Sequence, residues 1–151
     1  MSFFDARAGD EIMLEKLTGF RFWAVSYGEA WGYPPMSLRS FQNPMSWLPG
    51  QPAVSDELPT MDNSHGISVY KTVQAAMDGG ADAIAGTSAN RADVPLCYRG
   101  GIVLGHVELW GSVVEHDRGY RAQYVQPITF IRAWGYDPDR ILREVQSQWR
   151  V

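Results

Sequence analysis

The sequence predicts an α+β domain: a bent antiparallel sheet or small β-barrel, with one short central helix and one C-terminal helix. Two long runs rich in β-branched and aromatic residues flank Asp117-Arg118-Gly119, which favours a β-hairpin. Apolar residues recur at helical spacing after Asp137. A length of 151 residues suits one domain that buries enough surface to need no disulfide.

The first forty residues are expected to hold a lead-in and two strands. We expect residues 1–18 to form a short amphipathic helix or a lead-in, and residues 19–151 to form a single globular domain. Residues 19–26, GFRFWAVS, alternate partly and predict a half-buried strand. Glycines and prolines then place Trp31 on a loop, and residues 36–41 are a second strand candidate.

The central region combines an irregular crossover with a strand and a helix. Prolines are spread through residues 43–63, which disfavours a helix or a central strand there. Residues 65–71, HGISVYK, predict a strand, and Thr72 is expected to begin a short helix that ends by Gly79-Gly80. A small-residue, glycine-rich loop is expected to follow over residues 79–95.

The hairpin prediction includes a register. Gly119 is expected to supply the positive φ of a three-residue loop. Glu115 then faces Arg121 and Val114 faces Ala122, so that an ion pair and an apolar pair fall on opposite faces of the sheet.

Two further signals shape the C-terminal half. Gly111-Ser112 interrupts the first hairpin run, which predicts a bulge or bend that lets a long strand curl. Asp137 and Pro138 predict an N-cap and a first helical turn. The apolar positions that follow at helical spacing are Ile141, Leu142, Val145 and Trp149.

Composition limits the classes of partner and the compartment. The net charge of −4 disfavours binding of extended nucleic acid, which depends on Lys and Arg neutralising phosphates. No apolar run approaches the roughly 20 residues that span a bilayer, so no membrane association is expected. A lone cysteine, Cys97, and an N-terminus that mixes acidic with apolar residues indicate the cytoplasm.

A metal site is one chemical possibility for the histidines of the hairpin. His106 and Glu108 share one strand face, and His116 lies across the bend. Two imidazoles and a carboxylate can form an open zinc or iron site. The chain has no H-E-x-x-H motif and no paired cysteines, so structural or surface histidines are the favoured interpretation, and neither metal nor cofactor is predicted.

Nucleophilic and acid–base chemistry have simpler explanations in this sequence. Cys97 lies between Leu96 and Tyr98, an apolar context that favours an inert thiol. The phosphate-binding, dinucleotide-binding and G-x-S-x-G motifs are missing from the sequence. Titratable side chains gather near the hairpin turn, where turn and cross-strand chemistry account for them: Glu115, His116, Asp117, Arg118, Tyr120 and Arg121.

The six tryptophans and seven tyrosines are the most suggestive feature, because aromatic walls with a few polar groups bind flat or charged ligands. We therefore expect a noncatalytic binding or interaction module for a small molecule, a nucleobase or a protein partner. The alternatives are a small metal-dependent or acid–base enzyme using the region of His106, Glu108 and His116, and a regulatory protein acting through a protein surface. The predicted cleft is lined by Trp31, Trp47, Tyr70 and Trp110 and edged by His116, Arg118 and Arg121.

Residues 101–124, GIVLGHVELWGSVVEHDRGYRAQY, resemble a signature of small bacterial and phage proteins, G-x-V-x-G-x-V-x-L-W-G-x-V-x-E-H-x-x-G-Y-R-A. The resemblance spans residues 19–127 and implies no activity. It implies that relatives carry cysteines suited to a metal, whereas residues 53–64 contain none here. A looser pattern is similar to PUA-like and ASCH-like barrels, which implies a cleft for RNA or a modified base. The positions outside the signature that also match are Gly19, Phe20, Arg21, Trp23, Trp47, Pro49, Gly50, His65, Gly66, Ile67 and Tyr70.

Overall fold

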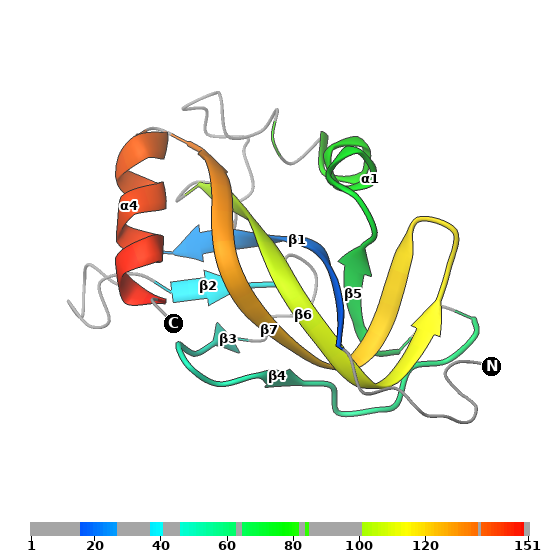
Figure 1. Ribbon diagram of the computed structural model, residues 1–151. Helices are drawn as coiled ribbons and strands as arrows, with labels where there is room; N and C mark the ends of the chain where they lie inside the picture. Colours follow the sequence, from blue (N-terminus) through cyan, green and yellow to red (C-terminus); the bar gives the residue numbers. More distant parts are fainter. Residues whose placement is uncertain are drawn as a thin grey trace.

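The computed structural model shows a seven-stranded antiparallel sheet with two helices, which confirms the α+β class (Figure 1). The structure describes residues 16–26, 37–40, 46–62, 65–81, 84, 101–135 and 137–149. Trp31, Cys97 and most of the predicted 79–95 loop lie outside these residues. The elements are β1 (Leu17–Ser26), β2 (Ser37–Arg39), β3 (Ser46–Trp47), β4 (Ala53–Val54), β5 (Ile67–Tyr70), α1 (Val73–Gly79), β6 (Ile102–Glu115), β7 (Gly119–Trp134) and α4 (Pro138–Gln148).

Four of the strands close a ring of pairings. β6 pairs with β7 in the long hairpin, and β1 lies along the other edge of β6 from Leu17 to Ala24. The short strand β5 pairs with β7 and meets β1 at Phe20 opposite Tyr70, which joins the two ends of the ring. β2 and β3 extend the sheet beyond β1, and β4 pairs with β7.

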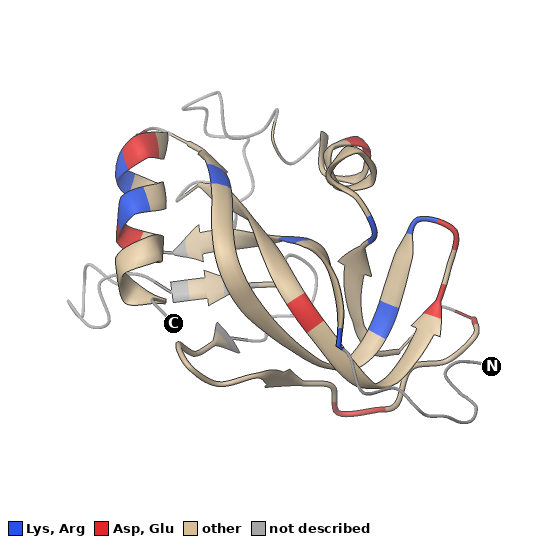
Figure 2. Cartoon of the chain, viewed as in Figure 1, with Lys and Arg blue, Asp and Glu red and all other residues tan. Residues whose placement is uncertain are grey.

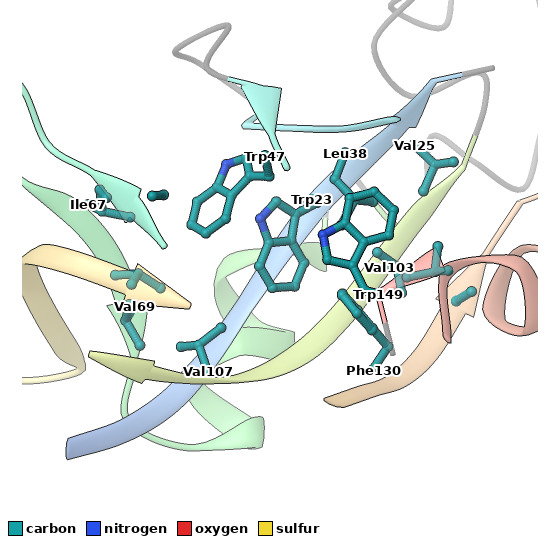
Figure 3. Close-up of a cluster of buried hydrophobic side chains, with 14 of the residues drawn as sticks. Trp23, Val25, Leu38, Trp47, Ile67, Val69, Val103, Val107, Phe130 and Trp149 are labelled. Atoms are coloured by element: carbon teal, nitrogen blue, oxygen red, sulfur yellow. The ribbon is translucent and has the colours of Figure 1, made fainter. Parts of the chain in front are cut away.

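The alternation of β1 divides the apolar side chains between two clusters. Trp23 and Val25 belong to the larger cluster, which the strands of the ring, β2 and α4 share (Figure 3). Phe22 belongs to a second cluster with Ala76 of α1, so that this helix covers the other face of β1. Because both faces are covered there, β1 is buried from Phe22 to Val25, and this part of its sequence is more apolar than that of a strand with one solvent-exposed face.

The hairpin is confirmed, but the predicted register and turn conformation are wrong. Glu115 faces Tyr120, and Val114 faces Arg121, a shift of one residue. Gly119 is not among the glycines with positive φ. It is instead the first residue of β7 and pairs with Tyr70 of β5. Because Gly119 pairs with the third strand, β5, it belongs to β7 and not to the turn.

The predicted bulge is confirmed at Gly111. The register of the hairpin shifts between Trp110 and Val113, and Gly111 has a φ of +83°. That left-handed conformation favours glycine. The interruption lets a strand of this length bend while the strands of the hairpin stay paired on both sides of it.

Both predicted helices are confirmed, together with their caps. The Thr72 side chain accepts a hydrogen bond from the Ala75 amide at the start of α1, and Gly80 is the C-cap. Asp137 caps α4, which begins at Pro138. Ile141 and Val145 of α4 and Trp149 just after it are buried against the sheet.

The crossover holds only two strands among the residues that the structure describes, β3 and β4, each of two residues. This agrees with the irregular segment predicted from its prolines. β1 begins at Leu17, slightly before the expected start of the domain. Neither of the two described helices is long and apolar enough to cross a membrane.

Candidate anion-binding site

One edge of β1 is shared by two strands that do not meet. β6 occupies one edge from Leu17 to Ala24, so β5 and β2 both lie on the other. β5 pairs at Phe20, and β2 pairs from Ala24 onwards. Between them lies the stretch from Arg21 to Trp23, which we call the seam. Neither strand pairs with β1 along the seam, so side chains occupy the space between β2 and β5.

The Arg21 guanidinium bridges the seam. Its Nη1 donates to the Ser68 carbonyl oxygen of β5 at 2.6 Å and lies 3.2 Å from the Ser68 hydroxyl. Its Nη2 donates to the Ser40 hydroxyl, just after β2, at 2.7 Å. These contacts join the two strands that share the β1 edge and fix the position of the guanidinium.

Trp47 forms the floor of this arrangement. The Arg21 guanidinium carbon lies 5.1 Å from the centroid of the Trp47 ring, within the range of a cation–π contact. The Trp47 indole nitrogen donates to the Ser40 hydroxyl at 3.1 Å. Ser40 is 8% exposed, and among the described residues it is the only polar residue that is buried. Its oxygen therefore accepts from two fixed donors.

The charge of Arg21 is not matched by a carboxylate among the described residues. Burial and, to a smaller extent, repulsion from Arg121 lower the pKa of Arg21 to about 10, and Tyr70 acts in the opposite direction. The Arg21 Nε is buried and has no hydrogen-bond partner. In Figure 2, neither β1 nor β5 carries an acidic residue.

Arg121 approaches the same part of β5 from the other side. It lies opposite Ser68 in the pairing of β5 with β7, and its Nη1 donates to the Gly66 carbonyl oxygen at 3.1 Å. The carbonyls of residues 66 and 68 thus hold one guanidinium each. We call the group of Arg21, Ser40, Trp47, Ser68 and Arg121 the arginine site.

The arginine site has the chemistry of an anion receptor. Guanidinium groups present several donors in a plane that matches carboxylate and phosphate oxygens. A buried cation without a counter-ion costs free energy that a bound anion would recover. Its described side chains offer positive charge, hydroxyl groups and an indole.

Three of the predicted ligand residues lie at or beside the seam: Trp47, Tyr70 and Arg121. Trp47 is only 3% exposed and packs edge-on against Trp23, with ring centroids 5.3 Å apart. It belongs to the core and not to an open aromatic wall, as Figure 3 shows. Tyr70 packs on the other cluster, with Phe22. Trp47 and Tyr70 therefore lie in different apolar clusters.

The remaining predicted ligand residues lie elsewhere. Trp110 stacks on Tyr124 beside the bulge, at a centroid distance of 5.6 Å. Arg118 pairs with Asp78 of α1 at 2.7 Å, and the His116 amide closes the hairpin turn on Gly119. These residues do not meet Trp47 at one site, and Trp31 lies outside the described residues.

The expected ion pair between Glu115 and Arg121 is also replaced. Glu115 pairs with Lys71 at 2.6 Å, because Lys71 directly follows β5 and β5 lies beside the hairpin. The titratable groups near the turn thus hold the hairpin tip to the region around α1. This supports the structural interpretation of that cluster.

The residues of the enzyme alternative are not brought together. His106 stacks on Phe20 at a centroid distance of 4.9 Å, Glu108 lies 3.7 Å from Lys16, and His116 lies just beyond the far end of β6. Within the part of the chain that the structure describes, no three His, Cys, Asp or Glu side chains form a group that could hold a metal ion.

Sequence reasoning missed Arg21, Ser40 and Ser68 as site residues. A signal for Arg21 exists, because it alternates with Trp23 and Val25 and so occupies an inward position of a buried strand. A charged residue in that position is expensive unless something binds it. Nothing local marks the two serines, which become neighbours only when β2 and β5 meet the same strand.

Comparison with known proteins does not change this picture: no family model, no curated protein and no solved structure matches the chain.

Proposed function

We propose that this protein is a noncatalytic binding module that receives an anionic group of its ligand at the arginine site. The observation that carries the proposal is the Arg21 guanidinium, held by Ser40 and Ser68 and lying on Trp47 without a described counter-ion. Ordering a cation in this way before the ligand arrives reduces the cost of binding.

The chemistry at the site favours binding over catalysis. Its described side chains are two guanidiniums, two hydroxyls and an indole, and among them there is no carboxylate or imidazole to act as a general base. These groups can hold and orient an anion. The rest of the ligand is proposed to be a small molecule, a single nucleobase or a protein segment.

We also propose three finer features expected from the sequence: a PUA-like relationship, a compact ligand and a cytoplasmic location. A PUA-like relationship would suit a ligand that carries a base, and the net charge of −4 favours a compact ligand over extended nucleic acid. The cytoplasm is the proposed compartment, because a single cysteine suits a reducing environment.

Thermal unfolding in the presence of anions tests the proposal. At constant ionic strength, acetate, citrate, phosphate and sulfate are compared with chloride for the wild type and for Arg21→Met. At least one of these anions should raise the Tm of the wild type in a saturable manner, and Arg21→Met should lose that rise.

Arg143→Met on the exposed side of α4 is the matched control, because it removes the same charge far from the seam. It should keep the full response to anions. If no anion stabilises the wild type beyond chloride, or if both variants respond equally, the arginine site is not the receptor.

A further inference from the structure

We infer that the end of the sheet at β4 is a docking surface for a short protein segment that combines apolar with basic side chains. The surface is a row of three side chains from neighbouring strands, Val54, Tyr124 and Trp110, which we call the aromatic row. The row shares no residue with the arginine site, so this inference is independent of the proposed function.

The register of the sheet places the aromatic row on one face. Val54 of β4 lies opposite Tyr124 of β7, and Tyr124 lies opposite Trp110 of β6. Residues directly opposite each other on neighbouring strands point to the same side of a sheet. The two rings stack, with their planes inclined by 19°. The chain neighbours of the row are buried in the larger apolar cluster, on the other face: Ala53, Val125 and Leu109.

The face that carries the aromatic row is covered by a helix only at its other end. Ile102 and Leu104 of β6 belong to the smaller apolar cluster, together with Ala76 of α1. Trp110 lies an even number of residues further along β6 and points to the same side. It is partly exposed and, like the rest of the row, lies outside both apolar clusters, while Val54 is 51% exposed. The cover that α1 provides therefore ends before the row.

The chain beyond β4 gives one end of the row a negative charge. Asp56 and Glu57 follow Val54 closely and are exposed, and Figure 2 shows this acidic segment directly after β4. Glu57 lies 3.2 Å from His65, whereas Asp56 has no ion pair among the described residues. Leu58, which is 58% exposed, places a further apolar side chain beyond the acidic pair. Apolar and acidic side chains are thus interleaved at this end.

The other end of the row carries no excess positive charge. The Lys16 ammonium lies over Trp110, 4.1 Å from the ring centroid. Glu108 lies 3.7 Å from the same ammonium and offsets its charge. The charge that remains beside the row is therefore negative. Such a surface attracts partners with Lys or Arg side chains and repels acidic ones.

The size of the surface favours a short segment over a folded domain. A standard interface between two folded proteins takes about 20–30 residues from each partner, and the row with its acidic segment supplies far fewer. Aromatic side chains are enriched among the residues that anchor interfaces. We expect apolar side chains of the segment to pack beside Val54 and the two rings, and a Lys or Arg to lie near Asp56.

Two synthetic amphipathic peptides of equal length test the inference by calorimetry. Both have leucine at the apolar positions, and the polar positions are lysine in one peptide and glutamate in the other. The lysine peptide should bind the wild type about tenfold more tightly than the glutamate peptide, because charges that are complementary across an interface favour binding and like charges oppose it.

Matched variants assign the binding to the aromatic row. Val54→Ser should weaken the lysine peptide by roughly fivefold, the scale of truncating an apolar anchor. Ile131→Ser is the control, because Ile131 is 44% exposed but lies elsewhere on β7, and it should leave the affinity unchanged. All the substituted side chains in these experiments are exposed, so the folded state should be retained, which thermal unfolding checks.

A second pair of variants separates local from overall charge. Asp56→Lys and Asp139→Lys change the net charge by the same amount, but Asp139 is in the first turn of α4. Asp56→Lys should weaken the lysine peptide by roughly fivefold or more, whereas Asp139→Lys should retain most of the affinity, because exposed charges interact only weakly beyond about 10 Å in salt.

Four outcomes would overturn the inference. These are no binding of either peptide, equal binding of both, equal losses in Val54→Ser and Ile131→Ser, and equal losses in Asp56→Lys and Asp139→Lys. Dimerisation of the wild type in light scattering that Val54→Ser abolishes would also overturn it, since a second copy of the chain would then occupy the row. The response of the wild type to anions tests the arginine site separately, so either proposal can fail alone.

Discussion

At the scale of single residues, Trp47 joins the core to the arginine site. Its ring packs on Trp23, while its indole nitrogen holds Ser40 and its face supports Arg21. One side chain thus contributes both to stability and to the position of the proposed receptor. The two contributions can be separated, because they depend on different atoms of the indole.

Substitution of Trp47 by Phe and by Ala should separate them. Trp47→Phe keeps a ring but removes the hydrogen bond to Ser40, which should cost about 1 kcal/mol of unfolding free energy. Trp47→Ala leaves a cavity in the core and should cost about 3–5 kcal/mol. Urea unfolding measures both; equal losses would show that the ring does not pack as described.

At the scale of elements, the hairpin shows how a third strand decides a register. The turn residues alone favour a loop that ends on Gly119, yet Gly119 pairs with Tyr70 and belongs to β7. A Cβ at Gly119 would lie 2.2 Å from the Val69 carbonyl oxygen, so β5 approaches too closely for any side chain. The glycine serves contact between strands and not the turn.

Gly119→Ala and Gly50→Ala provide a matched test of that role. Gly119→Ala forces backbone apart and should cost about 3 kcal/mol or more, the scale of a severe packing disruption. Gly50 has a φ of +76° with nothing within 4 Å of its Cβ position, so Gly50→Ala should cost only about 1 kcal/mol of backbone strain. Chemical denaturation compares the two, and a smaller loss for Gly119→Ala would contradict the close approach.

The contact between α1 and the hairpin tip predicts a dependence on pH. Hydrogen bonds from Gln74 and Arg118 lower the pKa of Asp78 below its ordinary value. The ionised carboxylate is therefore favoured in the folded state. Its contribution to stability is present at neutral pH. This contribution is lost as the pH falls below the ordinary pKa of an aspartate, about 4.

Asp78→Asn should remove this part of the acid sensitivity. The variant should be less stable than the wild type at pH 7, and the difference should shrink progressively as the pH falls below about 4, the ordinary aspartate pKa. Asp56→Asn, at an exposed position after β4, is the control and should not show the same convergence. A gap between Asp78→Asn and the wild type that is independent of pH would exclude the carboxylate as its origin.

At the scale of the whole molecule, the parts that could be predicted from the sequence are those set by local signals. The hairpin, its bulge at Gly111 and both capped helices follow from turn, glycine and N-cap chemistry within a few residues. The ring of strands could not be predicted, because it depends on β1 meeting β5 and β6 across long stretches of chain.

The same distinction applies to the candidate site. The abundance of aromatic residues points to Trp47, and the predicted hairpin turn points to Arg121. Neither signal shows which side chains lie next to one another in the fold. Arg21 acquires its partners only because β2 and β5 occupy the same edge of β1. Whether Trp47 is exposed likewise depends on packing against Trp23, which composition does not reveal.

The closed ring also has a consequence for how the chain folds. The hairpin of β6 and β7 joins segments that are adjacent in sequence, whereas β1 must find β6 after most of the chain has been made. The entropy of closing so large a loop slows that encounter. We therefore expect a transition state in which the hairpin is formed and β1 is still undocked, so that the arginine site assembles in the last step of folding.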